Sequence, residues 1–185
     1  MGNKGLKLSP HFSLGELCKT SVNSLDGNIP GQEEIENLKR LCPWLEELRK
    51  RYNERYVLPV GAIREGQAPC APRATHSCAS PCVSPCVSLE EPIVITSGYR
   101  SPEVNKCVGG VYSSNHLTGC AVDIRCVGVE QAIRYAAILL DVADEWKQDY
   151  DELLIERNRH GRYWVHFAVR PPEEGNRRKT LFLTA

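Results

Sequence analysis

The spacing of apolar residues predicts two long helices. Residues 33–52 carry leucine or isoleucine at steps of three and four, which puts one apolar stripe along a helix. Pro43 falls inside this run. Because proline lacks an amide donor and clashes with the preceding turn, we expect it to kink or restart the helix. Residues 129–146 repeat the same spacing with alanine, isoleucine and leucine and predict the second long helix.

Short apolar runs rich in β-branched residues predict strands. They occupy residues 92–96, 121–126, 152–156, 163–170 and 180–183. Ser13 followed by Glu16 fits the capping box of a short helix, and residues 102–107 predict another. Helices therefore precede a strand-rich half with one crossing helix. This order indicates an α+β domain with a small antiparallel sheet, which carries the functional site, and with helices packed on one side.

Residues 61–91 differ from the rest of the chain. They are rich in Ala, Pro, Ser and Cys, and residues 77–88 read as three tetrapeptide repeats, SCAS, PCVS and PCVS. The cysteines of this segment are Cys70, Cys78, Cys82 and Cys86. A second metal site including His76 is one interpretation, but the prolines oppose the helix that would align cysteines four residues apart. We expect one domain over residues 1–185, with 61–91 as a low-complexity inserted loop.

Composition narrows the choice of partners. The 185 residues include 23 Lys+Arg and 23 Asp+Glu, so the formal net charge is zero. A balanced chain gives no electrostatic reason to bind nucleic acid or a membrane surface, and we expect neither as a partner. The first residues, MGNKGLKLSPHFSLGEL, lack the apolar stretch of a signal peptide. We therefore expect a monomer that is synthesised in the cytoplasm without a signal peptide.

Three residues in the strand-rich half form a candidate metal site. His116 lies in a polar loop, and Asp123 lies in the strand that follows. Since strand side chains alternate between faces, Asp123 points away from its apolar neighbours, and His166 does the same in WVHFAV. If the two strands are neighbours, the three side chains converge. Two histidines and one carboxylate are a common catalytic zinc set, although non-haem iron uses the same ligand types.

Three linked motifs carry a family resemblance. ITSGYRSPEVNKCVGG, SSNHLTGCAVDI and WVHFAV, in this order, closely resemble the M15 family of zinc D-Ala-D-Ala carboxypeptidases. The resemblance is nearest to the short subfamily common in bacteriophages and gut bacteria, and it covers most of residues 8–170 apart from the insertion. It implies one zinc ion per chain as the cofactor, held by His116, Asp123 and His166.

The resemblance also implies residues that contact the substrate. Arg100, in the Ser-Gly-Tyr-Arg turn, corresponds to an arginine that contacts the substrate and polarises its carbonyl. A guanidinium suits this role because it can stabilise the oxyanion of a tetrahedral intermediate. The alternative for Arg100 is a structural ion pair. Ser114 matches a substrate-contacting position, and we expect Tyr99, in the same turn as Arg100, to bind substrate as well.

The motifs fix the general base less firmly. Some family members place a glutamate three residues before the last histidine, where this sequence has Tyr163. Glu156 resembles the acidic residue that the short subfamily carries before its last motif, and it is the predicted catalytic base. Its direction is open, since alternation only groups it with Leu154 and Glu152. His160 is the second candidate, because histidine exchanges protons near neutral pH.

Taken with the resemblance, these residues predict a zinc metallopeptidase that hydrolyses peptide bonds of peptidoglycan stem peptides. It would be a D-Ala-D-Ala carboxypeptidase or an endolysin-type endopeptidase. The lack of a signal peptide fits a phage-encoded enzyme released to the cell wall at lysis. The alternative is a zinc-bound binding or virion structural module without turnover, which the tyrosine at position 163 favours.

Overall fold

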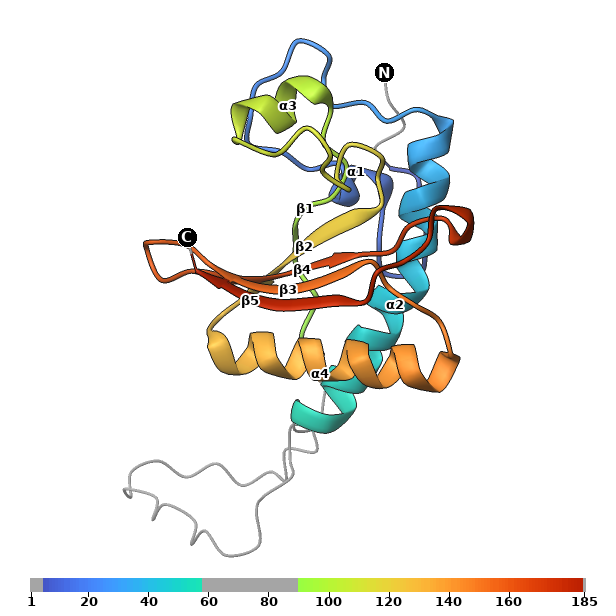
Figure 1. Cartoon of the computed structure of the whole chain (residues 1–185), viewed down its shortest axis with the longest axis vertical. Helices are drawn as coiled ribbons and strands as arrows, with labels where there is room; N and C mark the ends of the chain where they lie inside the picture. Colours follow the sequence, from blue (N-terminus) through green and yellow to red (C-terminus); the bar gives the residue numbers. More distant parts are fainter. Residues whose placement is uncertain (1–4, 58–89, 185) are drawn as a thin grey trace, which may run out of the picture.

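The computed structural model describes residues 5–57 and 90–184, and its centre is a five-stranded sheet (Figure 1). The strands lie in the order β1-β2-β4-β3-β5. Their bounds are Ile95–Ser97 for β1, Ala121–Cys126 for β2, Glu152–Arg157 for β3, Tyr163–Ala168 for β4 and Lys179–Thr184 for β5. This mixture of helices and one sheet confirms the predicted α+β class.

The sheet is antiparallel except at one edge. β1 pairs antiparallel with β2, β2 with β4, and β4 with β3, whereas β5 runs parallel to β3. β2 and β3 occupy both edges of β4, so β5 cannot pair with the strand that it follows, and it joins the outer edge of β3. β3 and β5 both run opposite to β4, so they are parallel to each other. The prediction of an antiparallel sheet is therefore wrong at this edge.

Two long helices bury one face of the sheet. α2 is Gln32–Tyr56 and α4 is Val129–Trp146, and their apolar stripes join the inward strand residues in one core cluster. α2 reaches the sheet through Trp44, whose ring centroid lies 5.2 Å from that of Phe167. The helix continues through Pro43, so the prediction of a restart there is wrong. Burial of the stripe on both sides of the proline stabilises the helix against the missing hydrogen bond.

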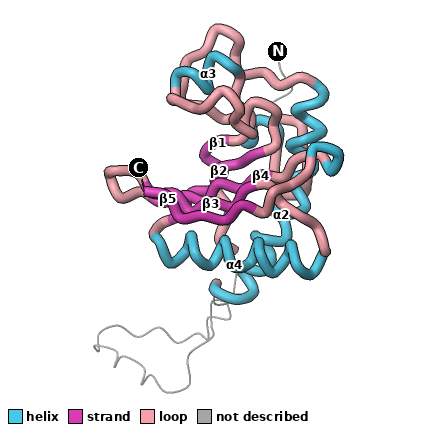
Figure 2. The backbone as a smooth tube through the Cα atoms, viewed as in Figure 1, coloured by secondary structure: helices cyan, strands magenta, loops and turns pink. Residues whose placement is uncertain are grey.

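Two short helices lie away from α4. α1 is Leu14–Leu17 and α3 is Pro102–Cys107; Figures 1 and 2 show both on the side of the sheet opposite to α4. The Ser13 side chain accepts a hydrogen bond from the Glu16 amide at 3.4 Å and so caps α1 as expected. A further 3₁₀ turn, Pro172–Glu174, lies between β4 and β5. The polar face of the sheet is thus bordered by loops and short helices.

The inserted loop predicted at 61–91 lies outside the described residues except for Glu90 and Glu91, and so do its four cysteines. The two described ends of the chain that flank it are held together. The Asn53 side chain accepts from the Glu91 amide at 2.6 Å and donates to the Glu91 carbonyl at 3.0 Å. Within residues 5–57 and 90–184, no helix combines the length and apolar character needed to cross a membrane.

Candidate metal centre and its cleft

Strand pairing brings the predicted metal ligands together. In the register of β2 and β4, Asp123 lies directly opposite His166. The residues beside them in each strand, Val122 and Val165 among them, point into the core, so both polar side chains are on the other face. His116 reaches the same point from the turn before β2. All three residues are buried.

The spacing of the three ligand atoms suits a tetrahedral metal. His116 Nε2 lies 3.2 Å from both His166 Nδ1 and Asp123 Oδ1, and His166 Nδ1 lies 2.9 Å from Asp123 Oδ1. A tetrahedral zinc with bonds of about 2.0 Å sets its ligand atoms about 3.3 Å apart. Among the described residues, this is the group of three His, Cys, Asp or Glu side chains arranged to hold a metal.

One hydrogen bond and one ion-pair contact set which nitrogen of each imidazole faces the candidate metal position. His116 Nδ1 donates to the Gly98 carbonyl at 2.7 Å, which leaves the Nε2 lone pair free. His166 Nε2 lies 3.5 Å from Glu152 Oε2, which leaves Nδ1 directed at Asp123 and His116. Metal-binding histidines characteristically bind a carbonyl or carboxylate through the second nitrogen, because this contact sets the tautomer and orients the ring.

The ligand atoms lie at the floor of a cavity of about 710 Å³. Ser114 lines this cleft, as expected for a substrate-contacting residue, and its Oγ accepts from the His116 amide at 3.3 Å. Tyr99 does not line the cleft. It is 7% exposed within the core cluster, and its amide donates to the Leu17 carbonyl at 2.8 Å. The structure therefore gives Tyr99 a packing role rather than a position at the cleft wall.

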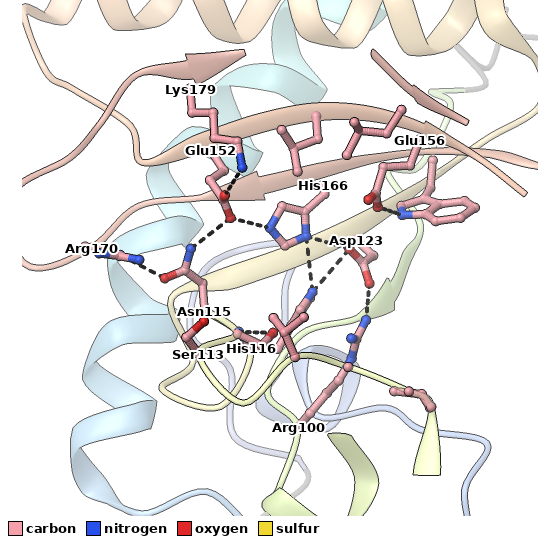
Figure 3. A pocket seen from close by; sticks show the side chains of 18 of the residues that line it. Arg100, Ser113, Asn115, His116, Asp123, Glu152, Glu156, His166, Arg170 and Lys179 are labelled. Atoms are coloured by element: carbon pink, nitrogen blue, oxygen red, sulfur yellow. Dashed lines mark hydrogen bonds and ion pairs between the residues drawn. The ribbon is translucent and has the colours of Figure 1, made fainter. Parts of the chain in front are cut away.

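Arg100 lines the cleft and also contacts a ligand. Its Nη2 donates to Asp123 Oδ2, and its Nε donates to Ser97 Oγ at 2.7 Å. Asp123 thus presents Oδ1 to the two histidines and Oδ2 to the guanidinium (Figure 3). The structural ion pair considered for Arg100 is present, and it orients the carboxylate of the metal ligand.

The two candidates for the general base differ in position. Glu156 lines the cleft, and its Oε2 accepts a hydrogen bond from the Trp164 indole. His160 lies in the exposed turn between β3 and β4, contacts Arg159, and does not line the cleft. The strand register settles the direction of the Glu156 side chain, which alternation had left open. Leu154, two residues earlier on the same face, pairs with His166, so Glu156 lies on the face of the sheet that carries His166.

A comparison with protein families bears on this arrangement. Residues 86–158 match a family model described as Peptidase M15. We call residues 86–158 the M15 segment because of this similarity. The match supports the family resemblance that the motifs carry, and it supports a peptidase activity. The subfamily stays a prediction. A search of curated proteins gives no match.

The M15 segment includes Arg100, His116, Asp123 and Glu156 but ends before His166. The third ligand therefore depends on the pairing of β4 with β2, which sets His166 opposite Asp123. The matched segment includes the first two candidate ligands, and the strand register places the third candidate beside them.

The sequence analysis did not single out Glu152, a further candidate residue of the cleft. Glu152 lines the cleft and faces His166 from the side opposite Glu156 (Figure 3). Contact with His166 lowers the pKa of Glu152 to about 2, so this carboxylate stays ionised. The signal was present, since Glu152, Leu154 and Glu156 share one strand face, but the alternation alone did not give a reason to prefer either glutamate.

The candidate ligands change one another's pKa values. Burial opposes ionisation of Asp123, but the charges and hydrogen bonds of His116 and His166 outweigh it and lower the pKa of the carboxyl. Burial likewise disfavours charge on His166, yet Asp123 and Glu152 raise its pKa to about 9. The site therefore gathers negative charge around the imidazoles, which favours any cation in the same position.

Proposed function

We propose that the protein is a zinc metallopeptidase that hydrolyses peptide bonds of peptidoglycan stem peptides, as a D-Ala-D-Ala carboxypeptidase or an endolysin-type endopeptidase. One observation carries this proposal: three ligand atoms at tetrahedral spacing lie at the floor of an open cleft, beside Glu156, in a chain with an M15 segment. Other parts of the cleft supply the groups that peptide hydrolysis requires.

The donor set fits zinc. His116 Nε2, His166 Nδ1 and Asp123 Oδ1 would hold the ion, and all three residues line the cleft. When bound, zinc supplies Lewis-acid activation of water and of the scissile carbonyl. Two nitrogens and one carboxylate also suit iron, and metal analysis separates the two ions.

Glu156 is the proposed general base. Burial raises its pKa from the ordinary value, which brings the carboxylate closer to the range where proton transfer is efficient. The Trp164 indole holds Oε2, so we assign the proton to Oε1. In this scheme Oε1 accepts the proton of the attacking water and then returns it to the amine of the leaving peptide as the carbon–nitrogen bond breaks.

Arg100 has two roles in the proposal. Its contact with Asp123 Oδ2 keeps Oδ1 directed at the histidines, and its remaining Nη1 group is available for the carbonyl oxygen of the substrate. A fixed guanidinium stabilises charge on that oxygen as the tetrahedral intermediate forms. Ser114, in the wall of the cleft, is a proposed substrate contact.

Digestion of purified peptidoglycan, followed by mass spectrometry of the released fragments, tests the proposal and identifies the bond. The wild-type protein should release D-Ala or cross-link fragments. Glu156→Gln should lower turnover at least about 100-fold while zinc content stays at one per chain. His160→Gln is the matched control, since His160 is exposed outside the cleft, and it should keep full activity.

Two outcomes would contradict the proposal. Equal activity of Glu156→Gln and wild type would remove Glu156 as the base. Full zinc content without fragments from several cell-wall types would favour the zinc-bound binding or virion structural module. Release to the cell wall at phage lysis and a monomeric state remain parts of the proposal, which secretion assays and light scattering test separately.

A further inference from the structure

One end of the cleft is built from cationic side chains. Arg170, Arg177 and Lys179 all line it, and they follow β4 in the sequence, outside the M15 segment. Their side chains are 25%, 49% and 42% exposed. Figure 3 shows Arg170 and Lys179 on the Glu152 side of His166, away from Glu156. The cations therefore lie beside the metal centre, on the side opposite the proposed base.

A buried carboxylate holds the arginines in place. Asp151 has no exposed surface. Its two oxygens accept from Arg177 Nε at 2.8 Å and Arg177 Nη2 at 2.7 Å, and Asp151 Oδ2 also lies 3.1 Å from Arg170 Nε. Asn115, the residue before the first metal ligand, donates to the same carboxylate at 2.8 Å. This network fixes the arginines relative to the metal centre at little further entropic cost.

The cluster keeps an excess of positive charge. Arg170, Arg177 and Lys179 carry three positive charges, whereas Asp151 and Glu152 carry two negative ones. Lys179 Nζ and Arg177 Nη2 each lie 3.1 Å from Glu152 Oε1. Arg100, the cation at the metal centre, is paired with Asp123 instead. An anion that enters the cleft would therefore be attracted most strongly to the end formed by Arg170, Arg177 and Lys179, where positive charge exceeds negative charge.

Position in the cleft, rather than exposure, separates these cations from a structural ion pair, since the Arg178 side chain is 41% exposed as well. Arg178, the neighbour of both Arg177 and Lys179, illustrates a structural role: it pairs with Asp144 and Asp149 and does not line the cleft. By contrast, Arg177 and Lys179 both line the cleft, with side chains that are 49% and 42% exposed.

We propose that Arg170, Arg177 and Lys179 form a subsite for a carboxylate of the substrate peptide. The inference rests on the proposed peptidase function and assigns these three residues, which lie outside the M15 segment, as the partners of that carboxylate. Guanidinium and ammonium groups bind carboxylates through charge-assisted hydrogen bonds. Contact through Glu152 links the subsite to His166, so the carboxylate lies within about two or three residues of extended peptide from the metal centre. It is either the C-terminal carboxylate or an acidic side chain.

Calorimetric binding to the zinc-loaded protein tests the subsite with three N-acetylated alanine peptides of equal length. One has a free C-terminal carboxylate, one a C-terminal amide, and one an amide plus a glutamate side chain. The wild type should prefer a carboxylate-bearing peptide to the plain amide at least about tenfold. Lys179→Gln should reduce that preference about fivefold, and Lys179→Arg should restore it. Arg178→Gln, the matched control, should leave it unchanged.

The design separates failure of the subsite from failure of the proposed function. An unchanged carboxylate preference in both Lys179→Gln and Arg177→Gln would overturn the subsite, even if the wild type hydrolyses peptides. Because Arg177 also holds Asp151, Lys179→Gln carries the test if Arg177→Gln does not fold. A carboxylate preference that Lys179→Gln weakens would support the subsite, even if no peptide in a separate assay is cleaved. The peptide that binds more tightly than the plain amide shows whether the subsite takes a C-terminal or a side-chain carboxylate.

Discussion

His166 illustrates how a single residue divides its contacts between metal and protein. Its Nδ1 faces the ligand atoms of Asp123 and His116, while its Nε2 faces Glu152. Glu156, on the same strand as Glu152, lines the other side of the cleft and contacts Trp164 instead of His166. The two glutamates of β3 thus have separable roles, one in orienting a ligand and one in proton transfer.

Substitution of these glutamates separates the roles. Glu152→Gln should weaken zinc binding about 10- to 100-fold, because a charged partner that orients a ligand histidine is removed. Glu156→Gln should leave zinc affinity within about twofold of wild type, since that carboxylate does not contact a ligand. Competition titration with a fluorescent zinc chelator measures both. Equal losses in the two variants would refute the division.

Strand alternation was enough to predict that Asp123 and His166 lie on the face of the sheet opposite the core. Successive side chains of a strand point to opposite faces, so the apolar neighbours determine the face of each. It could not rank Glu152 against Glu156, which share a face and differ only in what lies opposite them. A motif position does not give the direction of a side chain: Arg100 lines the cleft, while its neighbour Tyr99 packs in the core, and the contact of Tyr99 with substrate stays a prediction.

At the scale of elements, the turn after β1 depends on a close backbone approach. A Cβ at Gly98 would lie 2.1 Å from the Leu17 carbonyl oxygen of α1, which is fixed backbone. The Gly98 carbonyl also accepts from His116 Nδ1. The packing of α1 against the turn and the orientation of a metal ligand are therefore coupled.

Gly98→Ala should lower the free energy of unfolding by about 2 kcal/mol and weaken zinc binding, because the turn must move away from α1. Gly5→Ala is the control, since a Cβ there meets nothing within 4 Å. Urea denaturation and zinc titration measure the two effects. A stable variant with unchanged zinc affinity would show that the turn does not hold His116.

Asp151 connects β3 to the segment between β4 and β5 through Arg170 and Arg177. Burial opposes its ionisation, but hydrogen bonds from Arg177 and Asn115 and the charges of both arginines outweigh burial and lower the pKa. The folded protein therefore binds this proton less tightly than the unfolded chain. The stability that the carboxylate contributes is complete above the unfolded pKa of about 3.9 and is lost as pH falls through the folded pKa.

Asp151→Asn should lower the free energy of unfolding by about 3 kcal/mol at neutral pH, because two arginines lose their buried partner. The difference from wild type should shrink as the pH falls below about 4. Asp149→Asn, which removes an exposed partner of Arg178, should cost less than about 0.5 kcal/mol. Urea denaturation with chelator present measures this. A difference that stays constant down to pH 3 would contradict the linkage.

At the scale of the whole molecule, the insertion is attached away from the cleft. Its flanks meet where Asn53 binds Glu91, and Arg49 pairs with Glu90 beside them. Neither pair lines the cleft. Deletion of residues 66–88 should therefore leave zinc content and peptidoglycan hydrolysis unchanged, which the digestion assay measures. Loss of activity in a folded deletion variant would assign the insertion a functional role.

Much of the architecture could be predicted because amphipathic spacing determines elements locally. The helix of residues 129–146 and the strands of residues 121–126 and 163–170 follow directly from that spacing. The parallel edge strand and the cationic end of the cleft could not be predicted, because both depend on which strand β5 joins. That choice is set by occupied sheet edges, which no local pattern records.

Metal reconstitution tests the central claim most directly. Chelator-treated protein is titrated with zinc while peptidoglycan hydrolysis and bound zinc are followed together. Activity should rise in proportion to bound zinc and level off at one ion per chain, and His166→Ala should neither bind the ion tightly nor recover activity. Full hydrolysis by the metal-free protein, or full zinc binding and activity in His166→Ala, would contradict the assignment of His116, Asp123 and His166 as a catalytic zinc site.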